Sequence, residues 1–144
     1  RRVPAYGPYS HTEHHGGLPV MSIPTLFIRT GVLFGLAGML LGIFMGMNQD
    51  FRLAHFHAHL NLLGWVGFFL YGLFYALAPM ARQGLLPRLH YALSLIGLAV
   101  FMVGLFGVAM GAFETMVAFA AIGSVLVVGG FLVFVVIVFR VRIG

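Results

Sequence analysis

The sequence of 144 residues contains no cysteine, which excludes disulfides, iron–sulfur clusters and thiolate metal sites. Lysine is absent as well, so all eight basic residues are arginines, and only three residues are acidic. Charged residues make up 8% of the chain, whereas 61% of it is hydrophobic. Soluble domains of this size do not have such a composition. The sequence therefore predicts an integral membrane protein.

Four long apolar stretches follow a polar segment at the start of the chain. Residues 1–24 form the polar segment, which contains prolines and three histidines and which we expect to be a flexible tail rather than a metal site. Residues 25–144 form the predicted membrane domain, because crossing ~30 Å of hydrocarbon takes about 20 apolar residues. Short connections favour antiparallel neighbours, so the predicted fold is an all-α, antiparallel four-helix bundle in the membrane. Its predicted spans are 26–48, 53–78, 88–112 and 115–139.

The arginines are distributed unequally between the two ends of the predicted bundle. One end carries most of them, and the other carries Arg52 together with Asp50 and Glu114. Cytoplasmic loops are enriched in basic residues, so we expect both termini in the cytoplasm, in a bacterial inner membrane. The positive charge is attributed to topology and lipid headgroups, and no nucleic-acid partner is expected. The arginine-rich end comprises Arg29, Arg82, Arg88, Arg140 and Arg142.

Three histidines, His55, His57 and His59, occupy alternate positions where the second span enters the membrane. Polar, titratable side chains inside a membrane are functional candidates by default. In an α-helix His55 and His59 lie about 40° apart and His57 points to the opposite side. This segment therefore offers imidazoles to two different neighbours. An alternative without a metal is that the rings reach the headgroup region or hydrogen-bond to a neighbouring helix.

Two kinds of metal site fit imidazole ligands at this position. His55 and His59 have the spacing with which two helical histidines bind zinc or copper. Heme is the simpler candidate, because iron needs one or two axial imidazoles and the porphyrin binds by apolar packing, here against residues such as Trp65. Met110 or Met116 would be a soft alternative ligand. A stripe of glycines in the first span is expected to serve helix packing rather than a flat cofactor. At the opposite end, His90 is expected to have a hydrogen-bonding or interfacial role rather than to bind metal.

The second span resembles one helix of a known family. The run from His57 through Asn61 and Trp65 to Gly67, continuing through Tyr71, Tyr75 and Pro79, is similar to a helix of the catalytic subunit of heme–copper oxidases and nitric oxide reductases. The cbb3-type oxidase is the closest in pattern. Residues 88–97 resemble the helix that follows it, and the resemblance covers residues 52–112. It implies that His57 binds an active-site heme and that His59 binds a low-spin heme.

The chain also departs from that family. The catalytic subunit has about three times as many helices, and this sequence has no match to its second low-spin heme ligand, its copper-site histidines or its cross-linked tyrosine. A complete proton-pumping oxidase is therefore excluded, and whether the chain is an enzyme stays open. His55 is an additional histidine and is kept as a further ligand candidate.

The predicted function is a small membrane cytochrome b that transfers electrons or binds a diatomic gas. Its heme b would be non-covalent, with His57 and His59 as iron ligands and Arg52 beside the propionates. Because no other histidine lies at that depth, we expect a homodimer that shares heme ligands between protomers. A redox protein or a quinone is the expected electron partner. The alternatives are a copper- or zinc-binding membrane protein and a cofactor-free subunit or assembly factor of a respiratory oxidase.

Overall fold

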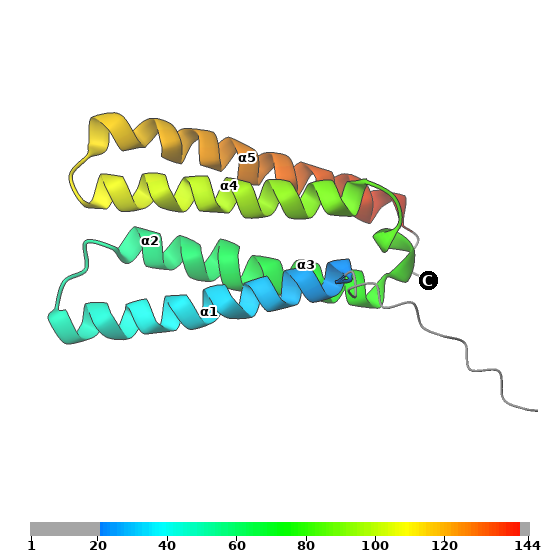
Figure 1. The fold of residues 1–144 in the computed structure, drawn as a ribbon, viewed down its shortest axis with the longest axis horizontal. Helices are drawn as coiled ribbons and strands as arrows, with labels where there is room; N and C mark the ends of the chain where they lie inside the picture. The colour runs from blue at the N-terminus through cyan, green and yellow to red at the C-terminus, as the bar shows by residue number, and fades with distance from the viewer. Residues whose placement is uncertain (1–20, 142–144) are drawn as a thin grey trace, which may run out of the picture.

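A computed structural model describes residues 21–141, and their regular secondary structure is helical (Figure 1). Long helices lie side by side, and the second of them contains a change of helix type in its middle. The elements in chain order are α1 (Ile23–Asn48), α2 (Ala54–His59), the π-helix η1 (Leu60–Gly67), α3 (Phe68–Leu77), the 3-10 helix η2 (Pro79–Arg82), α4 (Leu86–Ala109) and α5 (Phe113–Arg140).

Four helical stretches are long and apolar enough to cross a membrane, so the chain has the character of a multi-pass membrane protein. They are Ile23–Asn48, Ala54–Leu77, Leu86–Ala109 and Phe113–Arg140. Each boundary lies within three residues of the predicted one. The first and third helices begin earlier than predicted because Pro24 and Pro87 sit in their first turns, where proline needs no hydrogen-bond partner for its nitrogen.

The four stretches form two close pairs. In one pair α1 packs against the stretch from α2 through η1 to α3, and in the other, tighter pair α4 packs against α5. A methyl group placed on Gly97 would lie 2.8 Å from the backbone nitrogen of Val127, and one on Gly130 would lie 2.9 Å from the Ser94 hydroxyl. Small residues thus let the two backbones approach closely, as in many membrane helix pairs. The turn between them contains Gly111, whose φ of 92° falls in the left-handed region that favours glycine.

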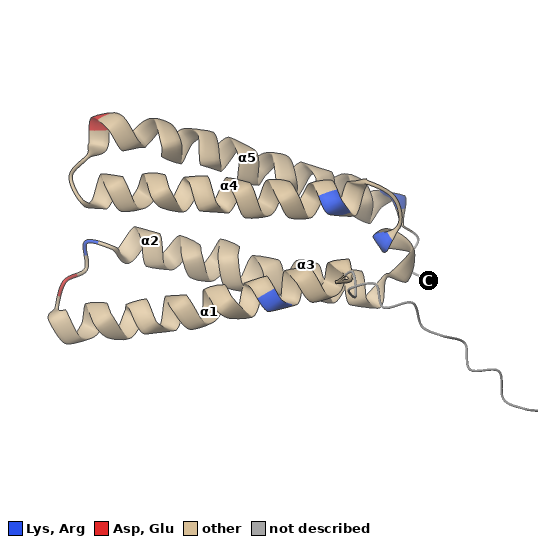
Figure 2. Cartoon of the chain, in the orientation of Figure 1, with Lys and Arg blue, Asp and Glu red and all other residues tan. Residues whose placement is uncertain are grey.

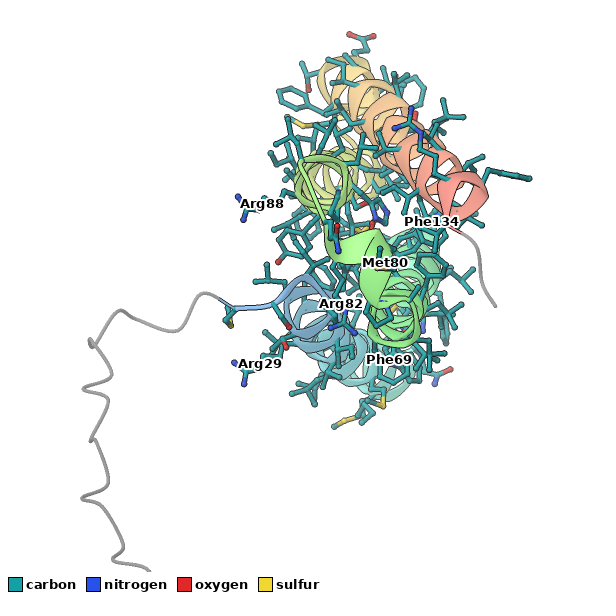
Figure 3. The ribbon with its side chains drawn as sticks, turned by 90° about the vertical axis from the view of Figure 1, so that its right-hand side faces the viewer. Arg29, Phe69, Met80, Arg82, Arg88 and Phe134 are labelled. Carbon is teal, nitrogen blue, oxygen red and sulfur yellow. The ribbon has the colours of Figure 1, made fainter. Side chains whose placement is uncertain are left out.

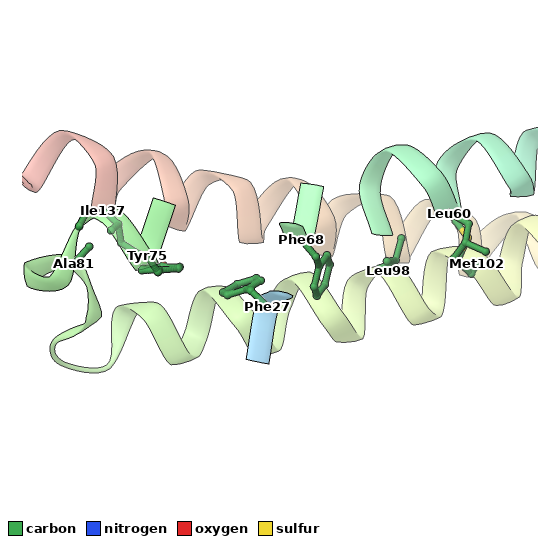
Figure 4. Close-up of a cluster of buried hydrophobic side chains, with 9 residues drawn as sticks. Phe27, Leu60, Phe68, Tyr75, Ala81, Leu98, Met102 and Ile137 are labelled. Atoms are coloured by element: carbon green, nitrogen blue, oxygen red, sulfur yellow. The ribbon is translucent and has the colours of Figure 1, made fainter. Parts of the chain in front are cut away.

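The buried core is a line of side chains along the bundle axis, contributed by both helix pairs (Figure 4). Phe27, Phe68, Tyr75 and Leu98 are at most 1% exposed and fill its middle. Outside this line most large apolar side chains are exposed, as expected for helices whose outer surface faces lipid. The aromatic part of the core lies toward the end of the bundle where the described chain begins and ends.

The two ends of the bundle differ in charge (Figure 2). Asp50, between α1 and α2, and Glu114, in the first turn of α5, lie at one end. The opposite end carries the other arginines of the described residues, Arg29, Arg82, Arg88 and Arg140, and Figure 3 views the molecule from that end. Arg82 there donates hydrogen bonds to the carbonyls of Tyr75, at 2.6 Å, and Ala76, at 2.7 Å. It thereby satisfies carbonyls that the end of α3 leaves without helical partners.

Candidate functional site

The three clustered histidines belong to α2, a short stretch of regular α-helix near the acidic end of the bundle. His55 is exposed, whereas His57 and His59 are partly buried. Successive residues of an α-helix are rotated by about 100°, so alternate rings leave the helix in different directions. The two partly buried rings accordingly contact different neighbours, α1 for His57 and α4 for His59.

The His57 ring occupies a groove that a glycine of α1 leaves open. A methyl group on Gly42 would lie 3.0 Å from Cε1 of His57, so any larger residue there would push the ring away. Asn61, one turn further on, donates from its amide nitrogen to the His57 carbonyl at 2.8 Å, and the same nitrogen lies 3.3 Å from Nδ1 of the ring. Neither Gly42 nor Asn61 was predicted from the sequence as a support of His57, although Asn61 follows His57 by four residues, one helical turn.

The His59 ring is oriented by the backbone of its own helix. Its Nδ1 lies 2.8 Å from the carbonyl oxygen of His55, and because a carbonyl can only accept, Nδ1 carries the proton of this hydrogen bond. In a neutral imidazole Nε2 then keeps its lone pair, which is the arrangement that most metal-bound histidines use. The ring meets the edge of Phe101 in α4, with centroids 5.1 Å apart and planes at 85°.

The helix changes to a π-helix immediately after His59, and this change was not predicted. The side chains of His57, Asn61 and Trp65 succeed one another at a spacing of four, and all three face glycines of α1. In a continuous α-helix such a series would drift by about 40° per step, or about 80° in total. The wider π-helical turn, with hydrogen bonds between residues five apart, reduces that drift. It therefore keeps this face against α1.

The glycine stripe of α1 provides the opposite side of this contact. Gly38 lies against the Asn61 amide and Gly35 lies against the Trp65 ring, where a methyl group would be 2.8 Å from the nearest ring carbon. Gly31 faces the backbone nitrogen of Phe69 at 3.0 Å, measured from the same kind of methyl position. The stripe packs a helix, as predicted. Trp65 is 39% exposed and lies below the histidines along the helix.

Arg52, the candidate partner of the heme propionates, is already paired within the loop before α2. Its guanidinium lies 2.6 Å from a carboxylate oxygen of Asp50, and both side chains are solvent-accessible. Hydrogen bonding from Arg52 lowers the pKa of Asp50 to about 2, and the same contact raises the pKa of Arg52. A propionate would have to compete with Asp50 for this cation.

His90 lies in the aromatic core, toward the arginine-rich end and away from the cluster. It is fully buried, and its Nδ1 lies 3.0 Å from the hydroxyl of Tyr75. The rings of Phe27 and Phe134 lie against it, with centroids 4.8 and 5.1 Å away. A hydrogen-bonding or interfacial role was predicted for His90. The contact with Tyr75 confirms the hydrogen bond, and full burial places the ring in the core instead of at the surface of the bundle.

The remaining candidate ligands do not join the cluster. Within residues 21–141, no three histidine, cysteine, aspartate or glutamate side chains come together as a metal-ion site. Met116 packs on Gly107 of α4, and Met110 is 44% exposed in the turn between α4 and α5. The tail histidines His11, His14 and His15 lie outside the described residues. Comparison of the chain with protein-family models, curated proteins and solved structures found no match.

Proposed function

We propose that this protein is a small membrane cytochrome b in which His57 and His59 hold heme b. The observation that carries the proposal is the His59 ring, whose Nδ1 is fixed by the His55 carbonyl so that Nε2 is left to bind a metal. The aromatic neighbours of α2, such as Phe101, suit an apolar porphyrin. The resemblance of this helix to the heme-ligand helix of heme–copper oxidases supports the same assignment.

The proposed heme would be non-covalent, because the chain has no cysteine for attachment. A heme here would supply a one-electron iron couple and, if one axial position stays open, a binding place for a diatomic gas. The protein would contribute two oriented imidazoles and an apolar surrounding. Arg52 would contribute a cation at the membrane surface, where propionates are stabilised. We further propose that the electrons come from a redox protein or a quinone.

We propose that the heme site is completed in a homodimer. His57 and His59 contact different helices, so the two rings of one chain do not converge on one iron between them. His90 is buried in the aromatic core toward the opposite end of the bundle, so it is too far along the helices to be the second ligand of a heme at the cluster. A two-fold axis would bring an equivalent histidine of a second chain to the same depth. In this arrangement protomers share heme ligands.

Native mass spectrometry of the purified protein in detergent, combined with its visible spectrum, tests both proposals. We expect a dimer that carries heme, with the Soret and α bands of a six-coordinate cytochrome b. A colourless protein from heme-replete cells would refute the heme assignment. A heme-loaded monomer with a high-spin spectrum that binds carbon monoxide readily would refute only the shared-ligand dimer, and would favour a five-coordinate heme within one protomer.

We also propose that the N- and C-termini both face the cytoplasm. The histidine cluster would then lie in the outer leaflet of a bacterial inner membrane. The unequal arginine distribution supports this orientation. Gln49 and Gln83 are exposed and lie in loops at opposite ends. Because the natural chain has no cysteine, a cysteine at either position is unique. We expect a membrane-impermeant thiol reagent to label position 49, and not 83, in spheroplasts, and the reverse result would contradict the orientation.

A further inference from the structure

A cavity of about 440 Å³ opens at the arginine-rich end, between the η2 loop, the start of α4 and the end of α5. Its wall is mostly apolar and includes Ala81, Leu86 and Ile137, of which Ala81 and Ile137 are buried. Two polar side chains, Gln83 and Arg140, line the same space. Its size falls in the range of small-molecule sites. The heme proposal makes no use of it.

Arg140 is the charged side chain that lines this cavity, and no residue between 21 and 141 pairs with it. Arg82, nearby in η2, is engaged by the carbonyls at the end of α3. Arg140 lies in the last turn of α5, and the structure gives its guanidinium no hydrogen bond or ion pair with any residue between 21 and 141. The two acidic residues of the described chain, Asp50 and Glu114, lie at the other end. Among residues 21–141, no acidic side chain would therefore repel an anion bound here.

From this combination we infer that the cavity binds one anionic phospholipid, with its phosphate on Arg140 and an acyl chain against the apolar wall. The guanidinium forms bidentate hydrogen bonds to phosphate oxygens. Gln83 adds an amide donor at the same rim. Met80 lines the cavity and is 69% exposed, so the apolar wall reaches the surface of the bundle there. The acyl chain can thus leave the site along Met80.

The charge decides between classes of lipid. A zwitterionic headgroup brings its own ammonium next to Arg140, and that repulsion offsets the attraction of its phosphate. An anionic headgroup has no such cation, and basic pockets between membrane helices recognise lipids of this kind. Free phosphate would meet the same guanidinium and would gain nothing from the apolar wall. The site is therefore expected to need both parts of the molecule.

Native mass spectrometry of the purified full chain, with phosphatidylglycerol or phosphatidylcholine added to the detergent, tests this inference. We expect one tightly held phosphatidylglycerol per chain, and a weakening of its binding by about tenfold or more in Arg140→Gln. Arg88→Gln is the matched control, because Arg88 is exposed near the same end and does not line the cavity. It should bind as the natural chain does.

A second variant tests the apolar part of the site. Leu86→Trp fills the cavity from its wall and leaves Arg140 in place, so it should also lose phosphatidylglycerol. Equal binding of phosphatidylcholine, equal loss in Arg88→Gln, or displacement by millimolar inorganic phosphate alone would overturn the inference. Unchanged binding in Arg140→Gln would overturn it as well. None of these readings depends on heme, so the result is independent of the proposed cytochrome function.

Discussion

Replacing His59 by alanine is expected to remove most of the heme from the purified protein. His59 is the candidate ligand whose ring the backbone holds in a metal-binding tautomer, with Nδ1 donating to the His55 carbonyl at 2.8 Å. Alanine supplies neither the iron ligand nor its orientation. The Soret absorbance per chain should fall at least tenfold, and His57→Ala should lower it comparably if both rings bind iron. The measurement is the pyridine hemochrome assay on detergent-purified protein.

His55→Ala is the matched control on the same turn of helix. Only the backbone carbonyl of His55 takes part in the contact with His59, and alanine retains that carbonyl. Its side chain is exposed and has no hydrogen bond within the described residues. We therefore expect His55→Ala to keep its heme. A loss as large as that of His59→Ala would instead make the His55 side chain a ligand and would contradict this assignment.

A third substitution separates ligation from packing at His57. Gly42→Leu leaves all three histidines in place and fills the groove where the His57 ring lies, since even a methyl group would come within 3.0 Å of Cε1. We expect a broadened or shifted Soret band from a displaced ring, together with reduced heme content. Gly46 is the control position, because no atom lies within 4 Å of a methyl group there, and Gly46→Leu should have no such effect.

Composition and periodicity were enough to predict the four helices and the directions of the histidine rings. The ring directions followed because α2 is a regular α-helix, in which the angle between residues is fixed. The π-helix that starts at Leu60 was missed for a physical reason. Asn61, Gly64 and Gly67 weaken the α-helix locally, but the wider turn becomes favourable only when it keeps that face against α1. Such a tertiary contact leaves no signal in the spacing of apolar residues along a single span.

The residues that surround the histidines could not be predicted from the sequence either. Phe101 is one of fifteen phenylalanines in the chain, and nothing in its position along the third span marks it as the neighbour of His59. Its place depends on how α4 rotates about its own axis, which the packing of α5 determines. The Asp50–Arg52 pair illustrates the opposite case, because two opposite charges two residues apart in a short loop were bound to meet.

Gly123→Ala is expected to destabilise the pairing of α4 and α5 more than any other single methyl group added to α5. A methyl group at Gly123 would overlap the backbone nitrogen and Cα of Phe101, and a helix backbone cannot move aside as a flexible side chain can. Overpacking of this kind typically destabilises a protein by about 1–3 kcal/mol. Thermal unfolding in detergent, followed by circular dichroism, should show a clearly lower midpoint.

Gly129→Ala supplies the matched control in the same helix. No atom lies within 4 Å of a methyl group at Gly129, and alanine is the better helix former by roughly 1 kcal/mol, so its midpoint should stay or rise. The comparison also reaches the candidate site. Phe101 contacts Gly123 through its backbone and His59 through its ring, so displacing it in Gly123→Ala should lower heme content as well. If the unfolding midpoint of Gly123→Ala equals that of Gly129→Ala, α5 does not pack on α4 at Phe101. The α4 side of the proposed heme site would then have to lie elsewhere.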